Sequence, residues 1–233
     1  NTIRNITTEA YEGIAEDGIV DTRPFAEIAR QWSTLHPEFA FLPRKFKIAF
    51  NGSAEDRAAT GWYDIGVQAL KNSAGEVGFT VKVGGGMGRT PIIGAVVREF
   101  LPWNQLLNYI EAVIRVYNGY GRRDNKWKAR IKILVKAEGQ QFIDAVEAEY
   151  KAIVNAASSL AHADMLAKYD ALNPHALKQL VMAKTRVLPF PTPVLEAAFR
   201  AAMDVFAHND SRSPEWRKIY ADMRNFQRDQ IFW

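Results

Sequence analysis

The sequence predicts an α+β fold, in which a mixed, largely antiparallel sheet is covered by helices and the C-terminal third is mostly helical. Segments typical of strands occur before residue 84, whereas from Ile92 onward apolar residues recur at helical spacing. Strands that come first and helices that come last are typical of the α+β class. With 233 residues, of which 48% are hydrophobic, the chain is long enough to bury a substantial core.

The first part of the chain predicts four strands and one helix. Residues 2–7 form a short strand, and Pro24 opens a helix in which apolar residues recur up to Trp32. The segment 42–50 alternates basic and apolar positions before the turn dipeptide Asn51-Gly52, which predicts a strand with one charged face. Residues 62–70 and 77–83 predict an antiparallel pair joined by the loop at 72–75.

The second part predicts helices. One helix carries Val96, Val97 and Phe100, and Pro102 separates it from a second with a long apolar stripe. A third is expected to begin near Asp124 or Asn125, because both are good N-caps.

The remainder, residues 142–226, is helical in pattern, with breaks expected at Asn173-Pro174, at 189–193 and at Ser213-Pro214. Small residues at 156–159 suggest a division into a domain of residues 1–155 and a helical extension of residues 156–233 packed on it.

Composition excludes several classes of protein. The chain has no cysteine, so disulfides, cysteine nucleophiles and thiolate-held iron–sulfur clusters are excluded within it. No apolar run approaches the roughly 20 residues needed to cross a bilayer, and there is no signal-like N-terminus, so we expect a cytoplasmic protein without a membrane partner. The net charge of +4 permits an anionic ligand without requiring nucleic acid. Because the sequence starts at Asn1 and stops at Trp233 beside an apolar element, we also expect a fragment of a longer protein.

Lys45 and Lys47 are the most informative pair. Side chains at i and i+2 of a strand share a face, so the two ammonium groups project together while Phe46 points the other way. They repel each other unless an anion or a carboxylate lies nearby. The competing interpretation is an edge strand, on which lysines prevent aggregation.

The glycine run at 84–88 follows a predicted strand and precedes a predicted helix, where backbone amides can bind an anion. It matches neither the P-loop nor the dinucleotide-binding pattern, and a tight turn explains it nearly as well.

A third feature is the basic segment 121–136. Its only acid is Asp124, and its seven basic residues are Arg122, Arg123, Lys126, Lys128, Arg130, Lys132 and Lys136. A solvated helix face explains the lysines, whereas Arg123 and Arg130 are better anion ligands because guanidinium can bind a carboxylate bidentately. The four histidines show no metal-binding spacing, and no metal ligands are predicted.

Four motifs together resemble, in order and spacing, the siroheme-dependent sulfite and nitrite reductases. They are Arg4-Asn5, Leu42-Pro43-Arg44-Lys45-Phe46-Lys47, Val83-Gly84-Gly85-Gly86 and Gly121-Arg122-Arg123-Asp124-Asn125. The resemblance covers about the first 150 residues, which look like the first siroheme-binding half-domain of the haemoprotein (beta) subunit.

The resemblance implies the cofactors and the roles of residues. The family uses siroheme, which carries many carboxylates, coupled to a four-iron four-sulfur cluster whose cysteines lie elsewhere in the polypeptide. Lys45 and Lys47 match the family's substrate-site lysines and Arg4 an active-site arginine, so catalytic roles are expected for them. Asn5, Arg123, Asn125 and Arg130 are expected to hold the macrocycle carboxylates or support the site. Neither cofactor is expected to stay bound to this chain alone, which is predicted to be inactive by itself.

The function implied is the six-electron reduction of sulfite to sulfide by a longer enzyme. Its partners would be the cluster-bearing half of the same polypeptide and a flavoprotein or ferredoxin as electron donor. Reduction of nitrite to ammonia by the same family is the first alternative. A non-catalytic basic module for anions or RNA is the second, although only Trp127 among the aromatics is interleaved with the basic residues.

Overall fold

In the computed structural model, residues 2–231 are described, and they divide into two compact units with a boundary between Met165 and Leu166. The expectations about the two chain ends concern Asn1, Phe232 and Trp233. These three residues lie outside the described residues. Among the described residues, no helix is both long and apolar enough to cross a membrane.

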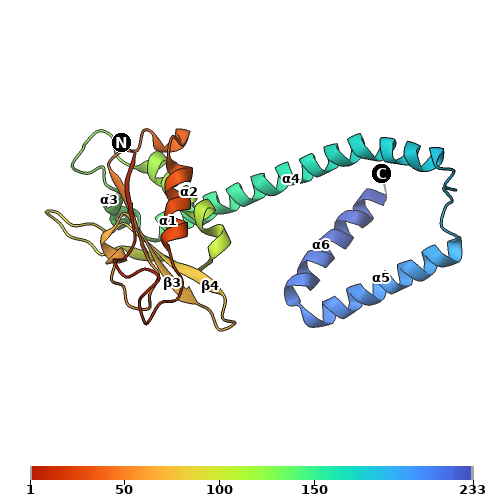
Figure 1. Ribbon diagram of the computed structural model, residues 1–233, viewed down its shortest axis with the longest axis horizontal. Helices are drawn as coiled ribbons and strands as arrows, with labels where there is room; N and C mark the ends of the chain where they lie inside the picture. The colour runs from red at the N-terminus through yellow and green to blue at the C-terminus, as the bar shows by residue number, and fades with distance from the viewer. Residues whose placement is uncertain (1, 232–233) are drawn as a thin grey trace. The chain divides into compact units, whose positions relative to one another are not determined.

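The first unit is built on one five-stranded sheet with the strands in sequence order (Figure 1). Its strands are β1 (Ile3–Thr7), β2 (Phe46–Asn51), β3 (Ile65–Lys71), β4 (Val77–Val83) and β5 (Ala95–Pro102). The β1–β2 and β2–β3 pairs are parallel, and the β3–β4 and β4–β5 pairs are antiparallel. The predicted mixed sheet and the predicted hairpin of β3 and β4 are therefore confirmed.

Helices cover one face of this sheet. The predicted first helix is α1 (Arg23–Ser33), and the long apolar stripe forms α2 (Leu106–Tyr120). Phe25 of α1 contacts Phe79 of β4 edge-on, with ring centroids 5.1 Å apart, and Phe46 of β2 contacts Tyr117 of α2. By strand register these contacts lie on the same side of the sheet, together with the buried Ile48, Phe50, Ile65, Val67, Val81 and Val83. The opposite face carries mostly small and polar residues, and Lys47 lies on that side.

The segment from Ala95 to Pro102 is a strand and not the predicted helix. Val97 and Leu101 are its buried apolar residues, and positions four apart share one face both in a helix and in a strand. Backbone pairing with β4 decides between the two, with two register irregularities along the pair. The β-branched pair Val96-Val97 fits this outcome.

The third predicted helix starts later than expected. Residues 122–130 form a loop, and α3 spans Ile131–Glu138. The two expected caps are used locally, because Asp124 binds Arg122 and the Asn125 side chain accepts a hydrogen bond from the Trp127 amide.

Two strand boundaries also differ from the prediction. β2 begins at Phe46 because Pro43 has no amide hydrogen and the Arg44 amide donates to the Tyr117 hydroxyl at 3.0 Å. β3 begins at Ile65 because Thr60–Trp62 form a short 3₁₀ helix, η2. Two further 3₁₀ helices, η1 (Pro37–Phe39) and η3 (Trp103–Gln105), precede β2 and α2.

The helical C-terminal part is confirmed as α4 (Gln140–Met182), α5 (Thr192–Arg212) and α6 (Pro214–Ile231). The break predicted at Asn173-Pro174 is wrong, since Pro174 lies inside α4, and residues 156–159 also lie within that helix. Phe206 of α5 packs against Trp216 and Tyr220 of α6, with ring centroids 6.1 and 5.0 Å away.

Candidate functional site

A basic pocket of about 520 Å³ opens in the first unit, and we call it the basic pocket throughout. Four segments form its wall: the start of β2, the end of η2 with the residues after it, the loop between β4 and β5, and the residues around the start of α3. The lining residues are Arg44, Lys45, Lys47, Trp62, Tyr63, Asp64, Met87, Gly88, Arg89, Thr90, Trp127, Arg130, Lys132 and Ile133. Six of them are cationic and Asp64 is the one acid, so the pocket favours an anion.

The predicted lysine pair lines this pocket. Phe46, between the two lysines, is fully buried in the core, as the alternation of side chains in a strand requires. Lys45 precedes the strand, and Lys47 is its second residue. The sequence pattern thus brings Lys45 and Lys47 to one cavity.

Asp64 lines the basic pocket and is only 1% exposed. One carboxylate oxygen lies 2.8 Å from Nη2 of Arg130, and the other accepts a hydrogen bond from the Lys47 amide at 3.0 Å. Burial raises the pKa of the Asp64 carboxyl above its usual value, while the charge of Arg130 acts in the opposite direction. Asp64 therefore links the start of β2 to Arg130.

The glycine run does not precede a helix, so the predicted helix-end anion site is wrong. Its amides serve the fold: Gly84 donates to the Asp64 carbonyl oxygen at 3.0 Å and Gly86 to that of Ile92 at 2.9 Å. A Cβ at Gly85 would lie 2.2 Å from the Gly61 carbonyl oxygen, and one at Gly86 would lie 2.6 Å from Nη2 of Arg130. The glycines are needed because the backbone and the Arg130 side chain approach this loop closely.

Lys132 was predicted to lie on a solvated helix face, but it is buried at the pocket edge with 6% exposure. Its ammonium group donates to the carbonyl oxygens of Met87 and Thr90, at 3.2 and 2.6 Å. Burial, followed by the nearby charge of Arg130, lowers the pKa of Lys132. Lys132 thus fastens the loop between β4 and β5 to α3.

Arg4 and Asn5 lie on β1, which pairs with β2. Asn5 is the register partner of Lys47, and a β-bulge between Ile3 and Asn5 falls at Arg4. Both residues line a second hollow, which they share with residues of α1 and of the segment that follows it. The structure therefore brings Lys45, Lys47 and Arg130 into one pocket and places Arg4 and Asn5 on the neighbouring strand, where they line a different hollow.

The other two predicted residues shape the loop at 121–130. Arg123 donates to the carbonyl oxygens of Phe41 and Asn118, at 2.7 and 2.9 Å, and Asn125 makes the local turn described above. Neither residue is among those that line the basic pocket. Their predicted contact with a cofactor stays a prediction.

Asp64 and Lys132 were missed by sequence reasoning. Asp64 is a single carboxylate before a strand, and its partners Lys47 and Arg130 are separated from it by 17 and 66 positions in the chain. No local pattern signals such a contact. For Lys132, the apolar neighbours Ile131 and Ile133 are the one available signal of burial.

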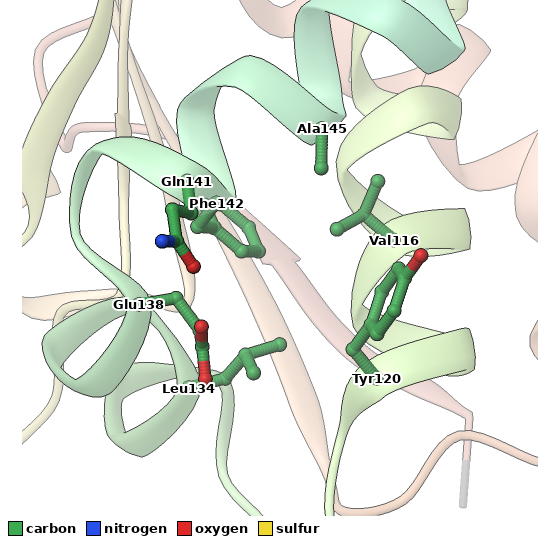
Figure 2. Close-up of a pocket in the computed structure, with 7 residues that line it drawn as sticks. All are labelled: Val116, Tyr120, Leu134, Glu138, Gln141, Phe142 and Ala145. Atoms are coloured by element: carbon green, nitrogen blue, oxygen red, sulfur yellow. The ribbon is translucent and has the colours of Figure 1, made fainter.

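A smaller pocket of about 290 Å³ lies between α2 and the segment of α3 and α4 (Figure 2). Val116, Leu134, Phe142 and Ala145 contribute apolar surface to it, and its polar residues are Tyr120, Glu138 and Gln141. No cationic side chain lines it, and its one charged group is a carboxylate. It is therefore unsuited to an anion, and the basic pocket remains the candidate site.

Comparison with known proteins gives the family. A family model described as "Nitrite and sulphite reductase 4Fe-4S domain" matches residues 1–153. The chain is 30% identical over 148 residues to "Sulfite reductase [ferredoxin] 1" of Mycolicibacterium paratuberculosis, an alignment that covers 63% of this chain and 26% of the relative. It is 33% identical over 158 residues to "Assimilatory ferredoxin-dependent nitrite reductase" of Haloferax mediterranei, covering 64% and 27% of the two chains.

A solved structure agrees with these sequence matches. The structure of the Mycobacterium tuberculosis NirA protein superposes with a TM-score of 0.59 at 27% identity, covering 64% of this chain and 27% of that one. The chain spans about a quarter of the length of these relatives. Since the family model covers well over half of the sequence, the chain belongs to the nitrite and sulphite reductase 4Fe-4S domain family.

Proposed function

We propose that this domain supplies the cationic wall of the active site of a sulfite reductase, which converts sulfite to sulfide and water with six electrons and accompanying protons. The observation that carries the proposal is the basic pocket, whose lining contains six cationic side chains and one buried carboxylate. Sulfite is an anion, and so are the carboxylates of siroheme. The domain would bind both.

The two cofactors of the family differ in their fit to this chain. A carboxylate-rich macrocycle fits the donors of the basic pocket, and Arg44, Arg89 and Arg130 are suited to its carboxylates because guanidinium binds them bidentately. When bound, siroheme supplies the iron at which substrate is reduced. A four-iron four-sulfur cluster does not fit, because it requires thiolates and the chain has no cysteine.

The cluster ligands would therefore come from another part of a longer polypeptide, which we propose as the partner of this domain. The external reductant would be a ferredoxin or a flavoprotein, and the names of the two relatives described above include ferredoxin.

The roles of the chain's own residues follow from their chemistry. Lys45 and Lys47 would donate hydrogen bonds from Nζ to the sulfite oxygens and stabilise the charge that develops as S–O bonds weaken. Each Nζ can also deliver a proton to an oxygen that leaves as water. Arg4, beside them on β1, would complete the anion contacts if the bound cofactor joins the two hollows.

Nitrite is the second candidate substrate, favoured by the 33% identity to the Haloferax mediterranei nitrite reductase. The same cationic wall suits either anion. An assay of the longer enzyme with sulfite and nitrite in parallel separates the two, since sulfide is the product in one case and ammonia in the other.

The proposal that the basic pocket binds the substrate anion can be tested on this chain. We expect sulfate, a stable analogue of the substrate anion, to bind at low ionic strength, and Lys47→Met to weaken this binding by about tenfold through loss of a charged hydrogen bond. Isothermal titration calorimetry measures both affinities. Lys71→Met is the matched control, because Lys71 is an exposed strand lysine outside the pocket. Equal affinities in all three proteins would contradict the proposal.

A further inference from the structure

The orientation of Arg130 depends on a single short contact. Its Nη2 lies 2.8 Å from Asp64, whereas its contacts with the carbonyl oxygens of Met87 and Gly85 are long, at 3.4 and 3.5 Å. The Nε atom of Arg130 is buried and has no hydrogen-bond partner among the described residues. Asp64 is therefore the group that fixes the direction of the guanidinium.

The Asp64 carboxylate also holds the start of β2 in place. Its second oxygen accepts the Lys47 amide, at the point where β2 has just begun, and its backbone carbonyl accepts the Gly84 amide. Three segments that line the basic pocket thus meet at one residue, which is almost completely buried. A buried carboxylate with two charged or backbone donors is a rigid anchor, because each lost contact would leave a polar group unpaired.

Charge gives a second reason for this placement. Six cations around one cavity repel each other when no anion is bound, and Asp64 is the acid that lines the cavity with them. An acid at the mouth would compete with the incoming anion. At 1% exposure, Asp64 instead pairs with Arg130 away from solvent, and the other charged residues of the lining are cationic.

We propose that Asp64 is a positioning residue, which holds Arg130 and the start of β2 so that the cations of the basic pocket converge on a bound anion. The inference rests on the proposed function of this pocket. Asp64 itself touches neither the substrate nor the cofactor in this account.

Asp64→Asn tests the proposal, because it keeps the size of the side chain and removes one of the two acceptors. An electrostatic effect alone would tighten anion binding, since a negative charge is removed. A positioning role predicts the opposite: the affinity for sulfate falls by about tenfold, the effect of losing one charged hydrogen bond. Unchanged or tighter binding in a folded variant would overturn the proposal.

A spectroscopic readout separates positioning from a general loss of stability. In the unchanged chain the buried Arg130 Nε–H is expected to give a resolved NMR signal that exchanges slowly with water. In Asp64→Asn the signal should broaden or exchange rapidly. Asp56→Asn is the matched control, because Asp56 is also ion-paired, to Lys82 at 3.2 Å, but does not line the pocket. An Arg130 signal that stays protected in Asp64→Asn would count against the proposal.

Two further variants complete the design. Once Arg130→Met has removed the guanidinium, adding Asp64→Asn should weaken sulfate binding less than it does in the unchanged chain, whereas two full and independent losses would contradict action through Arg130. If Asp64→Asn does not fold, Arg130→Lys is the substitute variant. It keeps the positive charge but lacks the planar guanidinium group, so it should bind sulfate about tenfold more weakly. Retained affinity in Arg130→Lys would overturn the proposal.

Failure of the proposed function is distinguishable from failure of this inference. If the unchanged chain binds no sulfate, the anion pocket is contradicted, and the Arg130 signal still shows whether Asp64 holds the guanidinium. If the unchanged chain binds sulfate and Asp64→Asn binds it equally well, only the positioning role is lost.

Discussion

Lys45→Met and Lys47→Met should each lower sulfite turnover by about 100- to 1,000-fold in the enzyme of which we propose this domain to be part, the usual cost of losing one preorganised donor to developing charge. Both lysines line the basic pocket, and methionine keeps most of the side-chain volume without the ammonium group. The measurement is sulfide formation per siroheme, with cofactor content determined by absorbance.

The control for this experiment is Lys71→Met at the end of β3, outside the pocket, which should leave turnover unchanged. The fold should also survive the pocket variants, because the lysines belong to a cluster of repelling cations. Near-normal turnover in both variants would mean that the lysines only protect the strand from aggregation, and the proposed mechanism would have to be withdrawn.

Phe46→Ala should destabilise the first unit by about 3–5 kcal/mol, the typical cost of truncating a fully buried phenylalanine. Phe46 is 0% exposed, and its ring lies 5.5 Å from that of Tyr117 between centroids. This loss is a large fraction of the roughly 5–15 kcal/mol that stabilises a typical domain, so the variant should unfold at a clearly lower urea concentration.

Urea denaturation measures this effect, and Phe41→Ala provides the control. Phe41 lies five residues earlier and is 77% exposed, so its truncation should change the free energy of unfolding by less than about 0.5 kcal/mol. Similar, small effects of the two substitutions would show that Phe46 is not in the core. The opposite orientation of the flanking lysines would then lose its structural basis.

The sequence predicts best those elements that local patterns specify. Alternation around Phe46 places the aromatic ring in the core and Lys47 on the other face, and the structure has this arrangement. The β3–β4 hairpin is likewise local, because the Asn72 side chain accepts hydrogen bonds from the amides of Ala74 and Glu76 in the turn. Pro24 near the start of α1 is a third such signal.

The predictions failed where contacts between residues far apart in the sequence determine the structure. β5 was predicted as a helix because Val96, Val97 and Phe100 recur at helical spacing, and only its pairing with β4 selects the strand. The anchor of the basic pocket was missed for the same reason, since Asp64 meets Arg130 across 66 positions in the chain. Arg130 itself was identified from its chemistry, although its local structure was predicted wrongly.

The most direct test of the central claim is the position of a bound anion in a crystal of this chain. Selenate resembles sulfate, and its selenium can be located by anomalous diffraction. We expect an anomalous peak within the basic pocket, in contact with Lys45, Lys47 or Arg130, and a weaker peak in crystals of Lys47→Met at the same selenate concentration. Selenate bound only at other basic surfaces, with the basic pocket empty, would contradict the account.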